Sequence, residues 1–319
     1  MEIHMSKKVT VIGAGSVGST IAYTLSVMGI ADEIVMIDIN ENKVLGEALD
    51  IRQGLPFCST KSVYAGGYAE AENSDIVVIT SGVPRKAGQT RLELAQVNVD
   101  ILKGIMTKIT KYAPDAIYLL VANPVDILTY TFVKYSGIPE HHVFGSGTML
   151  DSVRLRARLA EYYDIESKYI SAYALGEHGD SMFVPWSIVS LSGMGARLYE
   201  EKCKREDSML PPIDRAEIEK YVRTSGGRVI ARKGATFYAV SMSVAHMCRC
   251  ILENFGAVLP VSVMMHGEHG VEDVCLSYPT MINNDGVFTK VPTPLSPEEE
   301  ALLRRSGDAL KSVISGLAF

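Results

Sequence analysis

Short apolar runs without polar alternation recur through the first half of the chain. The strongest are "KKVTVIGAG" at 7–15, "DEIVMIDI" at 32–39, "SDIVVITSG" at 74–82 and "AIYLLVANP" at 116–124. Such runs predict strands that are buried on both faces, as in a parallel sheet covered by helices. The stretches between them have the period of amphipathic helices, for example at residues 90–114. This alternation predicts a doubly wound α/β domain.

The second half has a different pattern. A long helical stretch covers about residues 214–254, and strand-like segments with a turn at "NNDGV" (283–287) follow it. A C-terminal helix is expected from "SPEEEALL", because Ser296 is a favoured N-cap residue and Pro297 suits the first helical position. The pattern predicts an α/β domain followed by an α+β catalytic and substrate-binding domain, at residues 1–145 and 146–319.

The composition is that of a folded protein with an ordinary surface. Of 319 residues, 47% are hydrophobic and 21% are charged, and the net charge of −6 argues against nucleic-acid or membrane partners. No apolar run approaches the ~18 residues of a membrane span, and the first residues lack the apolar core of a signal peptide. The five cysteines form no CxxC pair, which predicts reduced thiols in a cytoplasmic protein.

A glycine-rich turn lies between the first predicted strand and its helix. Gly13, Gly15 and Gly18 have the G-x-G-x-x-G spacing, and Asp38 ends the next apolar run 20 residues after Gly18. The glycines allow a tight turn, close approach of a pyrophosphate and close helix packing, and the carboxylate suits ribose hydroxyls but repels a 2′-phosphate. The motif predicts a Rossmann domain that binds NAD rather than NADP. A glycine-rich turn of another α/β protein is the alternative.

Polar side chains follow two further predicted strands. Arg85 and Arg91 lie in a loop after the run that ends at Gly82, and Asn123 closes the next strand. Ligands of open α/β sheets bind beyond the carboxyl ends of the strands, so these three side chains are candidates for binding a substrate. A solvated basic loop and an Asx turn before a helix are the alternatives.

A histidine in a glycine-bounded turn suits acid–base chemistry. The tetrapeptide Gly-Glu-His-Gly occurs twice, with His178 in the first copy and His269 in the second. The chain also supplies Asp151 and Arg154, which are spaced to share one helical face, although such a pair is as readily a structural ion pair. One Asp, several Arg and one His suit the binding of a carboxylate and the transfer of a proton. We assign this chemistry to His178 and expect His269 in a turn between two strands.

Together these segments resemble the NAD-dependent L-lactate/L-malate dehydrogenases over essentially the whole chain. The matching segments are "VIGAGSVGST", "VITSGVPRKAGQTRLEL", "ANPVDILTY", "GSGTMLDSVRLR", "GEHGDSMFVPWS" and "RKGATFYAVSMSVAH". The resemblance implies that His178 is the acid/base and that Asp151 orients it. It implies that Arg154 binds the substrate carboxylate.

Further roles follow from the same resemblance. Arg91 is expected to polarise the reacting carbonyl, Asn123 to lie beside that carbonyl and the nicotinamide amide, and Thr236 to line the substrate pocket. The residues expected to contact NAD are Gly13, Gly15, Ser16, Val17, Gly18, Asp38, Ser81, Gly82, Asn98, Val121 and Asn123. The resemblance also implies a homotetramer or a homodimer.

Residue 85 is expected to select the substrate. In the family that the chain resembles, lactate enzymes typically have Gln at this loop position and malate enzymes have Arg, and this chain has Arg85. Arg85 would pair with the second carboxylate of oxaloacetate, but beside the methyl group of pyruvate it would be a buried charge without a partner. The surrounding segments resemble bacterial lactate dehydrogenases instead. We therefore expect a malate dehydrogenase, with lactate dehydrogenase as the alternative.

Several other signals are given no role in the reaction. In many bacterial lactate dehydrogenases an Arg and a His build a sugar-bisphosphate site; Arg156 matches the Arg, but Ser171 stands where the His is expected, so activation by fructose bisphosphate is not predicted. The histidines and cysteines lack metal-ligand spacing, so we expect no metal. An NAD-binding protein without catalysis is the alternative of another class, and the complete set of polar residues argues against it.

Overall fold

The computed structural model of the chain describes residues 6–84, 88–202 and 213–319. Arg85, the residue expected to select the substrate, lies outside the described residues. No helix in the described part of the chain has the length and apolar character needed to cross a bilayer.

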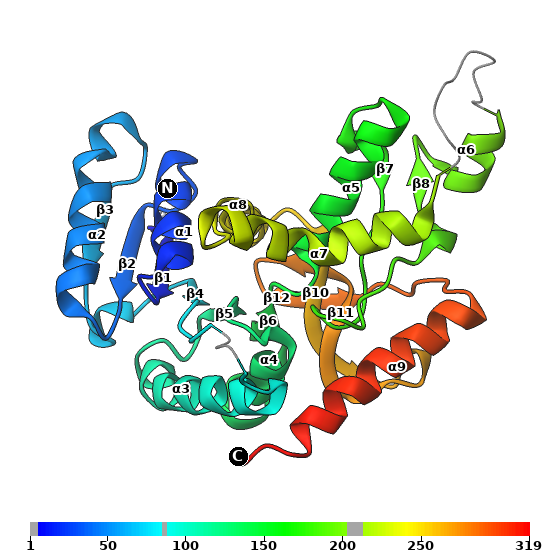
Figure 1. Ribbon diagram of the computed structural model, residues 1–319. Helices are drawn as coiled ribbons and strands as arrows, with labels where there is room; N and C mark the ends of the chain where they lie inside the picture. Colours follow the sequence, from blue (N-terminus) through cyan, green and yellow to red (C-terminus); the bar gives the residue numbers. More distant parts are fainter. Residues whose placement is uncertain (1–5, 85–87, 203–212) are drawn as a thin grey trace.

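A parallel sheet forms the first half of the molecule (Figure 1). Its strands are β1 (Lys8–Ile12), β2 (Glu33–Ile37), β3 (Ser62–Ala65), β4 (Ile76–Ile79), β5 (Ile117–Leu120) and β6 (Val143–Gly145). They lie in the order β3-β2-β1-β4-β5-β6, which is that of a doubly wound dinucleotide-binding sheet. The predicted Rossmann fold is therefore confirmed.

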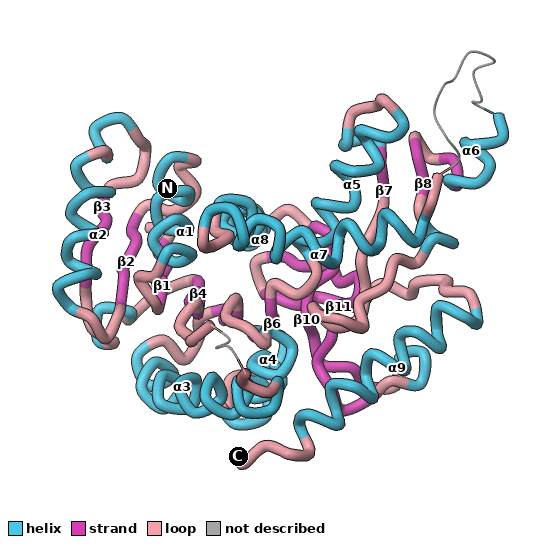
Figure 2. Tube along the Cα trace, viewed as in Figure 1, coloured by secondary structure: helices cyan, strands magenta, loops and turns pink. Residues whose placement is uncertain are grey.

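Helices on both sides of the sheet explain why its strands are apolar without alternation. They are α1 (Ser16–Val27), α2 (Glu41–Gln53), α3 (Arg91–Tyr112) and α4 (Val125–Tyr135). Every residue of β4 and of β5 is buried, as strands covered on both faces should be. Figure 2 shows helices flanking the strands, and α3 packs against α4.

The sheet continues beyond the parallel strands. The antiparallel strands β10 (Ala257–His266), β11 (Glu272–Asn283) and β12 (Gly286–Lys290) extend it, and β10 joins β6 through the pair Ser262–Gly145. The turn predicted at "NNDGV" is confirmed between β11 and β12. Because β6 and β10 share one sheet, the division between residues 145 and 146 stays a prediction.

The remaining elements are distributed over both halves of the molecule. They are α5 (Met149–Tyr163), α6 (Ala196–Lys202), α7 (Arg215–Lys233), α8 (Tyr238–Leu252) and α9 (Pro297–Ile314), a small antiparallel sheet of β7 (Ile170–Ser171), β8 (Ser190–Leu191) and β9 (Met194–Gly195), and the short 3-10 turns η1 (Leu55–Phe57), η2 (Ala69–Ala71), η3 (Glu140–His142), η4 (Ser167–Tyr169), η5 (Trp186–Ile188) and η6 (Glu268–Gly270). The predicted start of α9 is confirmed, because Ser296 forms a capping box with Glu299.

The helical stretch predicted over about residues 214–254 is divided into two helices. The structure has two helices there, α7 and α8, and α7 ends at Gly234, whose φ of +82° lies in the left-handed region. A helix cannot continue through this conformation, and glycine is the residue that adopts it at least cost. The break matters for the site, because α8 packs beside α1 of the nucleotide-binding half while α7 packs on α5 (Figure 1).

Gly18 should be required for the packing of α1 on the sheet. A Cβ at this position would overlap the carbonyl oxygen of Gly13, so Gly18→Ala should lower the free energy of unfolding by about 1–3 kcal/mol. Gly46→Ala, in an open part of α2, is the matched control and should stabilise the protein by about 0.5–1 kcal/mol. Urea denaturation of both variants measures the two effects. Equal midpoints for the two variants would contradict the packing role of Gly18.

Candidate active site

A cavity of about 500 Å³ lies where the carboxyl ends of the parallel strands meet α5 and α7. The nucleotide-binding half contributes residues that follow β4 and β5, among them Gly82, Val121 and Asn123. The other half contributes polar side chains from α5, from the segment around residue 178 and from the end of α7. A ligand in this cavity therefore contacts both halves of the chain, as expected for a site at the carboxyl edge of an open sheet.

The glycine-rich turn leaves one end of α1 free to receive an anion. Gly13 has a φ of +104°, and Gly15 is the N-cap of α1 with no side chain capping the helix. No described atom lies within 4 Å of the position that a Cβ would take at Gly15. The first-turn N–H groups and the positive end of the helix dipole thus face open space, which fits the pyrophosphate of a dinucleotide.

Asp38 is fixed at the end of β2, beside this turn. Its two carboxylate oxygens accept the backbone N–H groups of Ala14, at 2.6 Å, and Asn40, at 2.9 Å. Each oxygen keeps a further lone pair, so the carboxylate remains able to accept ribose hydroxyls. Ser16 is the exposed first residue of α1, and Val17 lines the cavity.

Asn98, one of the residues predicted to contact NAD, lies in α3 and is bonded to the loops that follow β4 and β5. Its side chain is buried in α3, donates to the carbonyls of Val83 and Asn123, and accepts the N–H of Val83 at 2.8 Å. Gly82, Val121 and Asn123 line the cavity, whereas Asn98 is not among its described lining residues. Asn98 therefore holds the loops after β4 and β5 in place. Ser81 follows β4 and lies next to Gly13.

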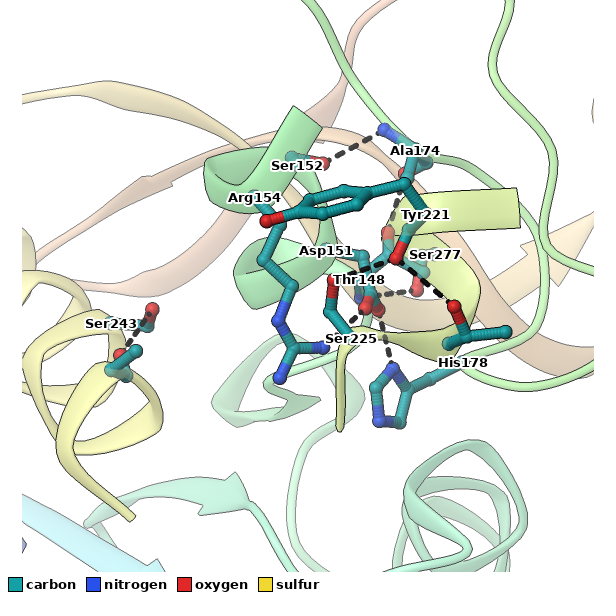
Figure 3. A network of polar contacts seen from close by, with 12 residues as sticks. Thr148, Asp151, Ser152, Arg154, Ala174, His178, Tyr221, Ser225, Ser243 and Ser277 are labelled. Carbon is teal, nitrogen blue, oxygen red and sulfur yellow. Dashed lines mark hydrogen bonds and ion pairs between the residues drawn. The ribbon is translucent and has the colours of Figure 1, made fainter. Parts of the chain in front are cut away.

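Three of the predicted catalytic and substrate-binding residues meet at one buried carboxylate. Asp151 Oδ2 lies 2.6 Å from His178 Nδ1, and Asp151 Oδ1 accepts Nη1 of Arg154 at 3.0 Å. Figure 3 shows Asp151 between the imidazole and the guanidinium group. Asp151 is only 4% exposed, while all three residues line the cavity. The ion pair considered for Asp151 and Arg154 does form, and His178 joins it.

The fold aligns these groups by joining α5 to the segment that carries His178. At the start of α5, the backbone N–H of Thr148 donates to Ser277 Oγ, at 2.9 Å, and the Thr148 hydroxyl donates to the carbonyl of Ala174. One turn later Ser152 Oγ accepts the N–H of Ala174 at 2.8 Å (Figure 3). Asp151 therefore projects from a helical turn that is hydrogen-bonded to Ala174, four residues before His178.

Charge at the site shifts two pKa values in opposite directions. Burial lowers the pKa of His178, but the charge and hydrogen bond of Asp151 outweigh it and hold the pKa above its ordinary value. Burial raises the pKa of Asp151, but His178 and Arg154 outweigh this effect and hold it below its ordinary value. The pair therefore favours an imidazolium next to a carboxylate, a form that can give a proton to a ligand in the cavity.

Asp126 is a part of the site that the sequence prediction missed. It is 2% exposed; its Oδ2 accepts the backbone N–H of His178 at 2.8 Å, and its Oδ1 accepts the hydroxyl of Ser262 at 2.6 Å. Burial raises the pKa of this carboxyl group. The signal in the sequence was a single aspartate inside the apolar segment "NPVDIL", where a charge needs buried partners.

Arg91 lies outside the cavity in this structure. It is the first residue of α3, where Thr90 and Glu93 form a capping box, and its guanidinium group forms an ion pair with Glu177. Neither Arg91 nor Glu177 is among the described residues that line the cavity. Thr236, by contrast, lines the cavity beyond the end of α7, and its contact with substrate stays a prediction.

The other singled-out residues lie elsewhere. Arg156 and Ser171 line a second cavity of about 410 Å³ beside the small sheet, so the two positions compared with the sugar-bisphosphate site are neighbours. His269 lies in η6 between β10 and β11, as predicted for the second copy of the tetrapeptide. Its ring nitrogens contact Glu300 and the Tyr278 hydroxyl, both at 3.0 Å.

Comparisons with known proteins agree with this arrangement. A family model described as the lactate/malate dehydrogenase NAD-binding domain matches residues 7–145, and one described as the lactate/malate dehydrogenase α/β C-terminal domain matches residues 148–318. L-lactate dehydrogenases of Acetivibrio thermocellus and of a Thermoanaerobacter species are 42% and 43% identical. These matches cover 98% and 97% of this chain, and 97% and 99% of the relatives.

Solved structures give the same result. A lactate dehydrogenase from a Medee basin deep-sea metagenome library aligns with a TM-score of 0.92 at 36% identity, covering 98% of this chain and 99% of that one. The minor L-lactate dehydrogenase of Enterococcus mundtii aligns with a TM-score of 0.91 at 36% identity, covering 98% of each chain. This protein therefore belongs to the lactate/malate dehydrogenase family, as its motifs predicted, and is an NAD-dependent oxidoreductase that acts on the CH–OH group of a 2-hydroxy acid.

Proposed function

We propose that this enzyme interconverts L-lactate and pyruvate, with His178 as the acid/base. The observation that carries the reaction is the placement of Asp151 between His178 and Arg154 in one cavity. NAD, which the glycine-rich turn and Asp38 would hold, would supply the hydride acceptor for the hydroxy acid and, in its reduced form, the hydride donor for the oxo acid. The protein must therefore bind a carboxylate, hold the substrate in one orientation and move one proton.

Each of these tasks suits one side chain. The guanidinium group of Arg154 pairs with the substrate carboxylate through two parallel hydrogen bonds, which fixes orientation as well as affinity. His178 uses Nδ1 to contact Asp151, so Nε2 is the nitrogen that exchanges a proton with the substrate oxygen. Asp151 stabilises the imidazolium form before the proton is given up. Arg91, brought to the carbonyl, stabilises the negative charge that grows on its oxygen.

The preference for lactate is supported by the names and similarity of the relatives. The L-lactate dehydrogenases named above match nearly the whole chain at 42% and 43% identity. This support outweighs the malate prediction, which depended on Arg85 alone. Malate is the second candidate, because an arginine at residue 85 would pair with the second carboxylate of oxaloacetate. A cytoplasmic location and a homotetrameric or homodimeric state stay predictions.

Replacement of His178 tests the acid/base role. His178→Asn should lower kcat about 10³-fold, because the proton donor is lost while the cavity keeps its shape. NADH binding, measured by its fluorescence, should persist, because His178 is not among the residues expected to contact NAD. Turnover close to that of the wild type would move the acid/base to another residue.

The pH profile tests the role of Asp151. Reduction of the oxo acid needs protonated His178, so kcat/KM should fall as pH rises through the raised pKa of His178. Asp151→Asn removes the charge that raises this pKa, so the fall should begin about one pH unit lower. NADH oxidation followed from pH 5 to 10 measures the shift. An unmoved alkaline limb would show that Asp151 does not set this pKa.

Substrate preference tests the lactate proposal against the malate candidate. With NADH, kcat/KM should be higher for pyruvate than for oxaloacetate, and the reverse order would favour malate. In either case Arg85→Gln should lower kcat/KM for oxaloacetate relative to pyruvate by about tenfold or more, because it removes a charge pair with the second carboxylate. An unchanged ratio would mean that other residues select the substrate.

A further inference from the structure

The ion pair between Arg91 and Glu177 joins two groups of very different burial. The side chain of Glu177 is 2% exposed, whereas that of Arg91 is 38% exposed. A buried carboxylate is costly unless a cation or several donors compensate it. Arg91 is the cation that contacts Glu177 among the described residues. Moving the guanidinium group away would leave the buried carboxylate of Glu177 without its cation, which is unfavourable in free energy.

Glu177 is held by two serines and is not among the described residues that line the cavity. Its carboxylate accepts the hydroxyl of Ser181 at 2.5 Å, and its backbone N–H donates to Ser306 Oγ of α9 at 2.7 Å. The two serine hydroxyls lie 3.0 Å apart. His178, the next residue, lines the cavity, but Glu177 is not among the described lining residues.

Arg91 therefore has two competing hydrogen-bond acceptors. One is the carboxylate of Glu177, which the fold holds in place; the other is the carbonyl oxygen of a bound 2-oxo acid, to which the guanidinium group donates before as well as during reduction. The capping box at Thr90 and Glu93 fixes the backbone at the start of α3, so the choice is made by the flexible arginine side chain. The conformation in which Arg91 points into the cavity and substrate binds productively is populated only in a fraction of the molecules, because Arg91 also pairs with Glu177. The apparent affinity for substrate is reduced in proportion to that populated fraction.

We infer that Glu177 is a positioning residue that holds Arg91 away from the cavity until a 2-oxo acid draws it in. This inference rests on the proposed function, since it takes Arg91 as the group that polarises the substrate carbonyl. Substrate must displace one carboxylate from Arg91 to complete the site. The ion pair thereby sets KM rather than the rate of the chemical step.

Steady-state kinetics of Glu177→Gln test the competition. The amide keeps the size of the side chain and an acceptor for Ser181, but removes the charge that holds Arg91. KM for pyruvate and for oxaloacetate should fall about threefold or more, with kcat unchanged or higher, because the productive conformation is more populated. Glu300→Gln is the matched control: it removes a carboxylate that contacts His269 and Arg304, far from Arg91, and should leave KM unchanged.

Three results would overturn the inference. An unchanged or higher KM in Glu177→Gln would mean that Glu177 does not compete with substrate for Arg91. A large loss of kcat would mean that Glu177 orients Arg91 for catalysis. A fall in KM in the Glu300→Gln control as well would assign the effect to net charge alone, and would equally overturn it.

A stability cycle tests the ion pair without any turnover. Urea midpoints are measured for the wild type, Arg91→Met, Glu177→Gln and the double variant, all without substrate. Arg91→Met should lower the midpoint, because Glu177 is left buried without its cation, and Glu177→Gln should restore part of the loss. If the shift of the double variant equals the sum of the two single shifts, the two side chains do not interact and the inferred ion pair is wrong. If the wild type reduces neither oxo acid, the proposed function fails, and the cycle still reports whether the pair exists.

Discussion

The structure of the active site depends on one buried carboxylate. Asp151 receives the imidazole of His178 on one oxygen and the guanidinium group of Arg154 on the other. Because Asp151 is almost fully buried, its charge acts through a poorly hydrated medium and is felt strongly by both partners. The same carboxylate therefore positions the substrate-binding cation and raises the pKa of the acid/base. The bonds of α5 to the segment before His178 keep these three groups in register.

Three buried carboxylates surround the segment that carries His178. Asp151 contacts its ring, Asp126 accepts its backbone N–H, and Glu177 is the residue before it. Asp151 comes from α5 and Asp126 from α4, so the segment is fixed from two directions. Ser262 of β10 bonds Asp126 and pairs with Gly145 of β6, which ties the position of His178 to the continuous sheet. The catalytic position is thus set by strands from both halves of the chain.

Much of the fold was predictable, because its signals are local. Buried parallel strands require apolar residues on both faces, and the glycine-rich turn requires small residues at fixed spacing. The start of α9 is a capping box of two residues three positions apart. The break between α7 and α8 was missed, because a helical period on both sides hid the left-handed Gly234. The contacts of Asp126 and Glu177 and the hydrogen bonds of Asn98 were not predicted, for another reason. Their partners lie far away in the sequence, and only packing brings them together.

The two copies of Gly-Glu-His-Gly separate what the sequence determines from what only the tertiary structure determines. The sequence alone determined the family, the nucleotide-binding half and the residue types available for acid–base chemistry, because these depend on composition and spacing. Only the tertiary structure decided what each histidine contacts. His178 meets the buried Asp151, whereas His269 meets Glu300 and a tyrosine hydroxyl in a turn. Identical tetrapeptides differ in chemistry because the pKa and orientation of an imidazole are set by charges that the fold places around it.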